Sequence, residues 1–355
     1  MKSGKLALRL VEKKGSIQYK SSVICFVYDR ILWATEPLQL IVNSHLLGRK
    51  YGHQSGDCLY ALNNQILAIK ADYAAGHCLD KVRTNIMDFF SVLKGHGLKV
   101  FANFPAFLLS QIMVLQGGLH MAAVAHGEDI PSEVGILSNA RSGSNVVLYG
   151  KIHHLTRSYL FRQMGNASLN IDVSGTMAEG LNQLNLFHVM GYFFEGLSAF
   201  LLARQTCDNK YAERGQSVLS KMKCWSEHSL WNWENKVLLL EAESMFTIGE
   251  FDRAVLTYDS AIRCAREHKF IHEEAIASEL AGTFYYERGI YQKSYSLLVH
   301  SVESYRTWGA HAIAGRVESV IGHNFGAALG TFVPSADISR DLCAPSLLSQ
   351  KKRSK

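Results

Sequence analysis

The chain has 355 residues, of which 48% are hydrophobic and 19% charged, so it is long and apolar enough to bury a sizeable core. Its formal charge of +6 lies at the ends, because residues 1–20 carry about +5 and residues 351–355 about +4, which leaves about −3 for the body. A body of that charge offers no broad basic face to phosphates and argues against a nucleic-acid groove. Five prolines, 28 glycines and the lack of paired short β-branched runs favour a helical protein.

Cysteine spacing and hydropathy indicate an intracellular protein, and we expect it in the cytoplasm. The cysteines lack any C-x-x-C pair, so we interpret them as reduced, buried, small apolar residues. The N-terminal apolar run is broken by Arg9 and cannot form a signal-peptide core. The sequence has no uninterrupted apolar run of about 18 residues, so we expect no membrane span. The seven cysteines are Cys25, Cys58, Cys78, Cys207, Cys224, Cys264 and Cys343.

Residues 1–116 are predicted to form N-terminal helical hairpins. Thr35 can cap a helix with Pro37 in its first turn, Gly56 can end it, and Asp57 can cap the next helix. Apolar residues then recur at steps of three and four, and Pro105 is expected to kink the last of these helices. Three successive helices, each stopped by glycine, are predicted over residues 57–76, 78–97 and 99–118.

The rest of the chain divides into three further segments. Residues 117–143 lose helical periodicity and collect Gly, Ser and Pro131, which predicts a long irregular connection. Residues 144–322 resume the helical pattern, with a break around residues 165–175, and form the C-terminal unit. Residues 323–355 carry turn formers and a basic end, and predict a flexible tail.

Within the C-terminal unit, one pattern occurs twice at an offset of 40 residues. Each copy has an amphipathic helix, a turn glycine, an aromatic residue two positions later and small residues on the next helix. A third register would place Asn209 at the glycine position, so that copy is weak even though Tyr211 follows. The residues that define the two copies are Gly249, Phe251, Ala254 and Ala261, and Gly289, Tyr291, Ser294 and Ser301.

This G-x-[FY]-x-x-[AS] unit between two helices resembles the tetratricopeptide repeat, with longer helices and without the closing proline. One helix pair cannot cover its own apolar face, so such pairs must stack. The resemblance implies an all-α fold, a tetratricopeptide-like α-solenoid of antiparallel helix pairs.

A closer resemblance is carried by KMKCWSEHSLWNWENKVLLLEAE, by GEFDRAVLTYDSAIRCAREHKFIHEEAIASELAGTFYYERG and by YRTWGAHAIAGRVESV. These stretches look like the helical segment that follows the AAA-type ATPase module in large multidomain serine/threonine and histidine kinase signalling proteins. Weaker similarity extends over most of residues 4–320. The chain lacks the P-loop, H-R-D and D-F-G motifs, so the resemblance implies a part without catalytic ATPase or kinase function. A fragment of a larger protein is one interpretation of that resemblance.

In tetratricopeptide-like solenoids the face of each first helix beside the packing stripe lines a concave groove. Its mixed charged and aromatic residues would suit a peptide or a neighbouring domain, although packing against adjacent helices is an equal alternative. The groove positions are Lys236, Leu239, Glu243, Phe246, Ile276, Glu279, Thr283 and Tyr286.

Other candidate sites have more ordinary interpretations. His153–His154 and the pair His268 and His272 are the only histidine clusters, and we favour surface or packing roles over a metal site. The neighbouring acids Glu241 and Glu243, and Glu273 and Glu274, point in different directions on a helix and are expected on a solvated face. Trp225, Trp231 and Trp233 could form a stacking platform, but core packing is favoured, and the terminal KKRSK could be a targeting or lipid-binding patch.

The sequence therefore predicts a non-catalytic helical-repeat scaffold for protein–protein or interdomain interaction. Its partner would be a protein, a peptide or an adjacent ATPase or kinase domain, with no nucleic acid, cofactor or metal. One alternative is a helical-repeat protein that binds single-stranded RNA, which would need a basic groove. Another is a metal- or histidine-based enzyme, for which no constellation of residues is found.

Overall fold

The computed structural model describes residues 2–13, 17–96, 101–118, 133–138, 145–164 and 185–329. Within these ranges the chain forms fifteen α-helices and one short 3-10 helix, without strands, which confirms the all-α prediction. The helices are α1 (Lys2–Lys13), α2 (Ile17–Arg30), η1 (Leu32–Ala34), α3 (Leu38–Ser55), α4 (Cys58–Ala74), α5 (Leu79–His96), α6 (Asn103–Gln116), α8 (Glu133–Ser138), α9 (Asn145–Leu160), α11 (Leu186–Thr206), α12 (Asn209–Ser226), α13 (Leu230–Ile248), α14 (Phe251–Glu267), α15 (Ile271–Glu287), α16 (Tyr291–Trp308) and α17 (His311–Leu329).

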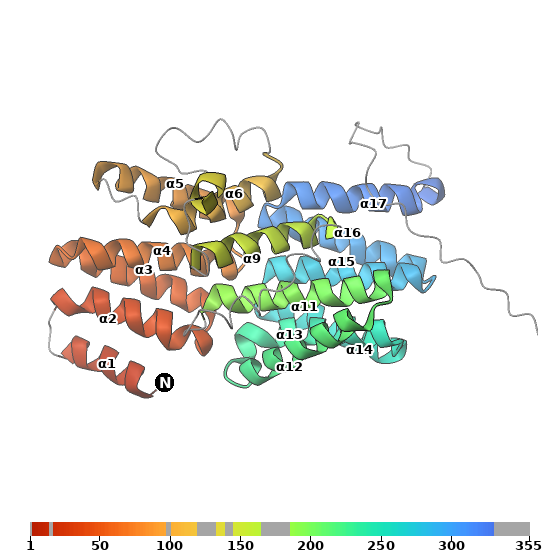
Figure 1. The fold of residues 1–355 in the computed structure, drawn as a ribbon, viewed down its shortest axis with the longest axis horizontal. Coiled ribbons are helices and arrows are strands. Elements are labelled where there is room, and N and C mark those ends of the chain that lie inside the picture. The colour runs from red at the N-terminus through yellow and green to blue at the C-terminus, as the bar shows by residue number, and fades with distance from the viewer. Residues whose placement is uncertain are drawn as a thin grey trace, which may run out of the picture.

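The helices lie in two stacks, each built of adjacent helices that pack on one another. One stack runs from α1 to α6 and the other from α12 to α17, with α9 and α11 between them (Figure 1). The stacks touch along their length, because α17 packs on α6 and Trp33 of η1 meets Trp233 of α13 edge to face, with ring centroids 6.1 Å apart. The two halves of the chain therefore share one hydrophobic core.

Two predicted capping residues of the N-terminal stack, Gly56 and Asp57, are confirmed, but Thr35 is not. The helix α3 begins at Leu38 with Pro37 as its N-cap, and Thr35 instead follows η1. Gly56 ends α3 in the left-handed conformation at φ 76°, and the Asp57 side chain accepts a hydrogen bond from the Tyr60 backbone N–H at the start of α4. The expected kink at Pro105 is wrong. The helix begins at Asn103, so Pro105 occupies its first turn, where a missing N–H breaks no helical hydrogen bond.

The two copies of the repeat form consecutive hairpins, α13–α14 and α15–α16. Gly249 and Gly289 both follow the first helix of their hairpin with positive φ, at 84° and 75°. That conformation favours glycine, since a Cβ would be strained there. Phe251 and Tyr291 begin the second helices. The small repeat residues Ala254, Ala261, Ser294 and Ser301 are all buried where the second helices cross the first.

A third hairpin, α11–α12, precedes these two, where the sequence gives only a weak copy. In its turn Cys207 adopts the left-handed conformation at φ 56°, which glycine adopts in the two later turns. Close packing is provided by Gly215, because a Cβ there would lie 2.6 Å from the Phe200 ring. The hairpin is thus preserved by different residues at slightly shifted positions.

The helix α11 is long and apolar, and almost all of its residues are buried in the core. It is the one described helix that is long and apolar enough to cross a membrane, but 94% of its most apolar window is buried inside the protein. Its buried Glu195 is paired with Arg214 of α12 at 2.5 Å. Such a helix is weak evidence for a membrane span, since core helices have the same composition.

Two predicted segment boundaries differ from the structure. A short helix, α8, lies inside residues 117–143, which were expected to be irregular throughout. The predicted tail at 323–355 begins too early, because α17 continues to Leu329 and buries Phe325 against Tyr286 and Tyr295. The rest of that tail, KKRSK included, and the break at 165–175 lie outside the described residues.

Candidate functional site

Most of the predicted groove positions lie in the interior. Lys236, Leu239, Glu243, Phe246, Ile276 and Glu279 are buried, Tyr286 is half-buried and Thr283 is exposed. The first six face other helices of the same chain, which favours the packing alternative. A partner-binding role for this face stays a prediction, and in this arrangement a partner would reach little of it beyond Thr283.

Glu243 of α13 is the first of two buried carboxylates on this face. It is 1% exposed, and its Oε2 accepts a hydrogen bond from Arg204 Nη2 of α11 at 2.6 Å. Its Oε1 accepts a hydrogen bond from the Tyr258 hydroxyl of α14. The Arg204 guanidinium also lies over the Phe246 ring, 4.4 Å from its centroid. Both carboxylate oxygens are therefore satisfied by helices on either side of α13.

Glu279 of α15 is the second, and it joins four structural segments. Its Oε1 accepts hydrogen bonds from Arg162 Nη2, in the turn after α9, at 2.6 Å and from Arg316 Nη2 of α17 at 2.7 Å. Its Oε2 accepts a hydrogen bond from the Tyr305 hydroxyl of α16 at 2.9 Å. Arg162 adopts φ 58°, an uncommon conformation for a non-glycine residue, and its guanidinium lies over the Tyr159 ring.

Charge pairing determines the ionisation of this cluster. Burial by itself raises the pKa of Glu279, but the Arg162 and Arg316 guanidinium groups and the hydrogen bonds outweigh it and lower the pKa to about 2. Burial, reinforced by the neighbouring carboxylates, raises the pKa of Tyr258 and of Tyr305 well above the usual tyrosine value. At neutral pH the Glu279 carboxylate is therefore charged and the phenols of Tyr258 and Tyr305 are neutral donors, so the cluster packs with paired charges.

A further buried ion pair, between Lys236 and Glu273, joins α13 to α15 at the other end of the face. Lys236 is 1% exposed, and its Nζ donates to Glu273 Oε2 and to the Asn232 carbonyl, both at 2.8 Å. Asn235 donates to the same carboxylate. Burial lowers the pKa of Lys236, and Glu273 opposes that effect. The ammonium also lies 4.4 Å from the centroid of the Phe270 ring, a favourable cation–π distance.

These contacts overturn the expectation that the neighbouring acids lie on a solvated face. Glu243, Glu273 and Glu274 are buried, and only Glu241 is partly open to solvent, where it pairs with Lys223 at 2.6 Å. The arginines that neutralise Glu243 and Glu279 come from α11, from the turn after α9 and from α17. Local sequence gives no sign of partners so far away in the chain.

The remaining aromatic and histidine candidates are separated in space. Trp233 packs on Trp33, Trp225 on Tyr192 and Trp231 on His268, so the three tryptophans do not form one platform. His153 is buried against Phe107, and burial lowers its pKa to about 3, whereas His154 is exposed. His272 lies in the core beside Trp308, with ring centroids 5.2 Å apart, and does not face His268.

The cysteine prediction is correct for two residues and wrong for four. Cys25 and Cys264 are buried, but the other described cysteines are exposed: Cys58, Cys78, Cys207 and Cys224. Burial, together with Asp29, raises the pKa of the Cys25 thiol to about 12. Cys264 is different from Cys25, because its Sγ faces Glu234 and His268. Together these three residues form the one group of three or more potential metal ligands in the described part of the chain.

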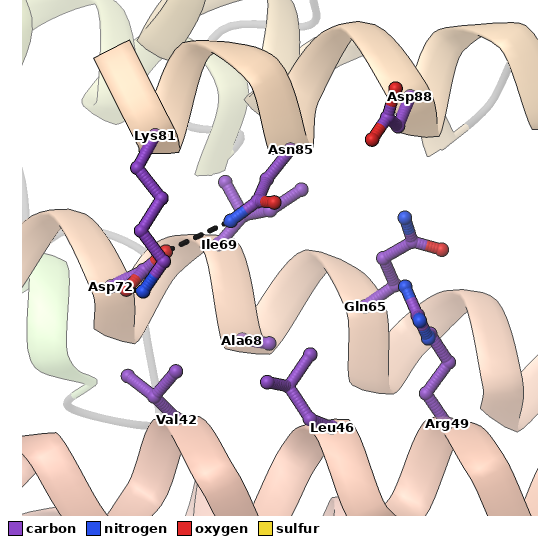
Figure 2. A pocket seen from close by; sticks show the side chains of 10 residues that line it. All are labelled: Val42, Leu46, Arg49, Gln65, Ala68, Ile69, Asp72, Lys81, Asn85 and Asp88. Atoms are coloured by element: carbon purple, nitrogen blue, oxygen red, sulfur yellow. Dashed lines mark hydrogen bonds and ion pairs between the residues drawn. The ribbon is translucent and has the colours of Figure 1, made fainter. Parts of the chain in front are cut away.

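An open cleft of about 300 Å³ lies between α3, α4 and α5 of the N-terminal stack. Figure 2 shows α4 between the other two helices, with Leu46 and Arg49 projecting from α3 and Asp88 from α5. Apolar side chains of α3 and α4 form its floor. The ten lining residues are Val42, Leu46, Arg49, Gln65, Ala68, Ile69, Asp72, Lys81, Asn85 and Asp88.

Polar groups of both signs surround this apolar floor. At one end the buried Asp72 accepts a hydrogen bond from Asn85 Nδ2 at 3.0 Å and lies 3.5 Å from Lys81 Nζ (Figure 2). At the other end lie Arg49 and Asp88, with the Gln65 amide pointing into the space between them (Figure 2). An apolar floor with a few polar groups at its ends is the usual composition of a binding cleft.

Comparisons with known proteins give no relative for this chain. No protein-family model matches it, and no curated protein matches it.

Proposed function

We propose that the chain is a non-catalytic helical-repeat scaffold, a tetratricopeptide-like solenoid of antiparallel helix pairs that binds a protein, a peptide or an adjacent domain. The observation that supports this most is the α3–α4–α5 cleft, which combines an apolar floor with charged ends. The buried carboxylates of Glu243 and Glu279 support it as well, because their ion pairs and their hydrogen bonds from Tyr258 and Tyr305 join seven segments of the C-terminal half.

The cleft is the proposed binding surface in place of the groove expected on α13 and α15. Its floor suits one or two apolar side chains of a peptide, and Lys81 and Arg49 suit acidic residues on either side of them. The side chain of Lys81 is 60% exposed, so it is free to reach a ligand as well as Asp72. The resemblance of the chain to segments beside AAA-type ATPase modules is the reason to expect an ATPase or kinase domain as neighbour, inside the cell and in the cytoplasm.

Peptide selection on the full-length chain tests this proposal. Peptides selected from a random displayed library are measured by calorimetry against Leu46→Glu and Lys81→Glu. The matched controls are Leu256→Glu, an exposed leucine on α14, and Lys293→Glu, a paired surface lysine on α16. We expect the cleft variants to weaken binding by at least about tenfold, or 1.4 kcal/mol, and the controls to leave it unchanged.

Equal binding to wild type and both cleft variants would remove the cleft from the proposal. Retention on heparin that persists after residues 2–13 and 330–355 are deleted would instead favour the RNA-binding alternative. Both measurements use variants whose folding is checked by helical circular dichroism.

A further inference from the structure

Three side chains of metal-binding chemistry meet at the start of α13 and the end of α14. Cys264 Sγ lies 3.5 Å from His268 Nδ1 and 3.7 Å from Glu234 Oε2, and the three atoms all lie within 4.8 Å of one another. Cys264 is buried, whereas His268 and Glu234 are half-buried. Cys264 and His268 are four residues apart and so share one face at the end of α14, and Glu234 approaches from α13.

We propose that Glu234, Cys264 and His268 form a Zn²⁺ site. In a tetrahedral zinc site with Zn–S of about 2.3 Å and Zn–N of about 2.0 Å, the sulfur and nitrogen ligands are separated by about 3.5 Å. The same geometry places sulfur and carboxylate oxygen about 3.6 Å apart. The two sulfur edges of the triangle thus have the dimensions that the metal requires, and the half-buried Glu234 can move to close the third.

The donor set selects zinc over the common hard cations. A thiolate and an imidazole nitrogen suit Zn²⁺, whereas Mg²⁺ and Ca²⁺ prefer oxygen ligands. As Zn²⁺ binds, the Zn–S bond forms and the Cys264 thiol releases its proton to solvent. Three protein ligands leave a fourth position, which a water molecule can fill.

Neighbouring residues hold the histidine in its metal-binding orientation. The Trp231 indole stacks on the His268 ring, with centroids 4.5 Å apart. Gln39 of α3 accepts a hydrogen bond from Trp231 Nε1 and donates one to the His268 carbonyl, both at 3.1 Å. Outer contacts of this kind fix ligand geometry in metal sites and contribute strongly to affinity.

Binding to the full-length, reduced protein tests the site. Zn²⁺ is titrated against a chromophoric chelator, and Co²⁺ is used as a spectroscopic probe. We expect one tight Zn²⁺ per chain, a rise in Tm on adding it, and a thiolate-to-cobalt charge-transfer band in the near ultraviolet. The band is diagnostic because it requires a sulfur ligand.

Three single variants assign the ligands: Cys264→Ser, His268→Gln and Glu234→Gln. Each should weaken Zn²⁺ binding by more than about 100-fold, since even residues that only orient a ligand contribute 10–100-fold. Cys264→Ser should also abolish the charge-transfer band. The control Cys224→Ser changes an exposed cysteine on α12 and should leave affinity, Tm shift and spectrum intact.

Glu234→Gln is near-isosteric, and a half-buried helical glutamate tolerates the amide. Loss of Zn²⁺ binding in this variant would therefore result from the lost ligand and not from misfolding. If Zn²⁺ binds without stoichiometry, or if affinity survives in Glu234→Gln and Cys264→Ser alike, the proposal is overturned. The three residues would then be a thiol hydrogen-bonded to an imidazole. The outcome is distinguishable from that of the scaffold proposal, because it measures binding of Zn²⁺ and not of a peptide.

Discussion

Replacing Glu279 by glutamine is the sharpest test of the buried network. The change keeps the volume of the side chain but leaves Arg162 and Arg316, with side chains 25% and 13% exposed, without their shared counter-charge. Lowering the carboxyl pKa from 4.5 to about 2 corresponds to about 3 kcal/mol of stability. Removing one partner of a buried pair costs about 3–5 kcal/mol in other proteins. The two routes agree, so we expect Glu279→Gln to lower the free energy of unfolding at pH 7 by about 3 kcal/mol.

The same substitution has a defined pH dependence. Because the folded pKa is lower than the unfolded one, the contribution of Glu279 is complete above about pH 5 and is lost as pH falls toward about 2. Urea denaturation should therefore show a difference between wild type and Glu279→Gln that falls at pH 3 to less than half its value at pH 7. The control Glu250→Gln, which alters an exposed pair with Arg253, should change stability by about 0.5 kcal/mol or less. A difference of under about 1 kcal/mol at pH 7, or an equal difference at both pH values, would refute the reasoning.

Two further predictions concern the packing of the repeat. Lys236→Met should destabilise by about 3–5 kcal/mol, because the buried Glu273 carboxylate loses its partner, and adding Glu273→Leu should restore most of that loss. Urea denaturation of the two single variants and the double variant measures this, and purely additive losses would contradict it. Gly282→Ala should destabilise by about 1–3 kcal/mol, because its Cβ would lie 2.8 Å from Leu298 Cγ where α15 crosses α16. Gly315→Ala, a helical glycine with nothing within 4 Å, should instead be neutral or raise stability by up to about 1 kcal/mol in thermal melts.

Features that depend on local sequence were predictable. Gly56, Gly249 and Gly289 end helices or occupy turns at positive φ, as the helix-stop pattern indicates. Spacing of 40 residues between Gly249 and Gly289 predicts two equivalent hairpins, and both are present. Such signals persist because a turn conformation or a close helix crossing restricts the residue at that one position.

Features that depend on distant helices were not predictable. Glu243 and Glu279 have the pattern of a solvated or groove-lining helix face, and only the approach of Arg204, Arg162 and Arg316 turns them into core residues. The Glu234–Cys264–His268 cluster was missed for a related reason. Its cysteine and histidine are four residues apart on one helix, but Glu234 is thirty residues earlier, and nothing in the local sequence places it beside them. The α3–α4–α5 cleft likewise requires three helices at once.

The proposed zinc site lies at the junction of the two stacks, which gives it a physical link to the N-terminal half. Gln39 of α3 holds both Trp231 and the His268 carbonyl, and Asn232 beside them binds the Leu38 backbone N–H at 3.1 Å. A metal that fixes His268 therefore also fixes the residues against which α3 docks. Because α3 forms one wall of the cleft, Zn²⁺ should restrain the cleft itself. Slower hydrogen exchange of the α3 backbone amides on adding Zn²⁺ would reveal that coupling. Loss of this effect in Glu234→Gln, with helical content unchanged, would assign it to the metal.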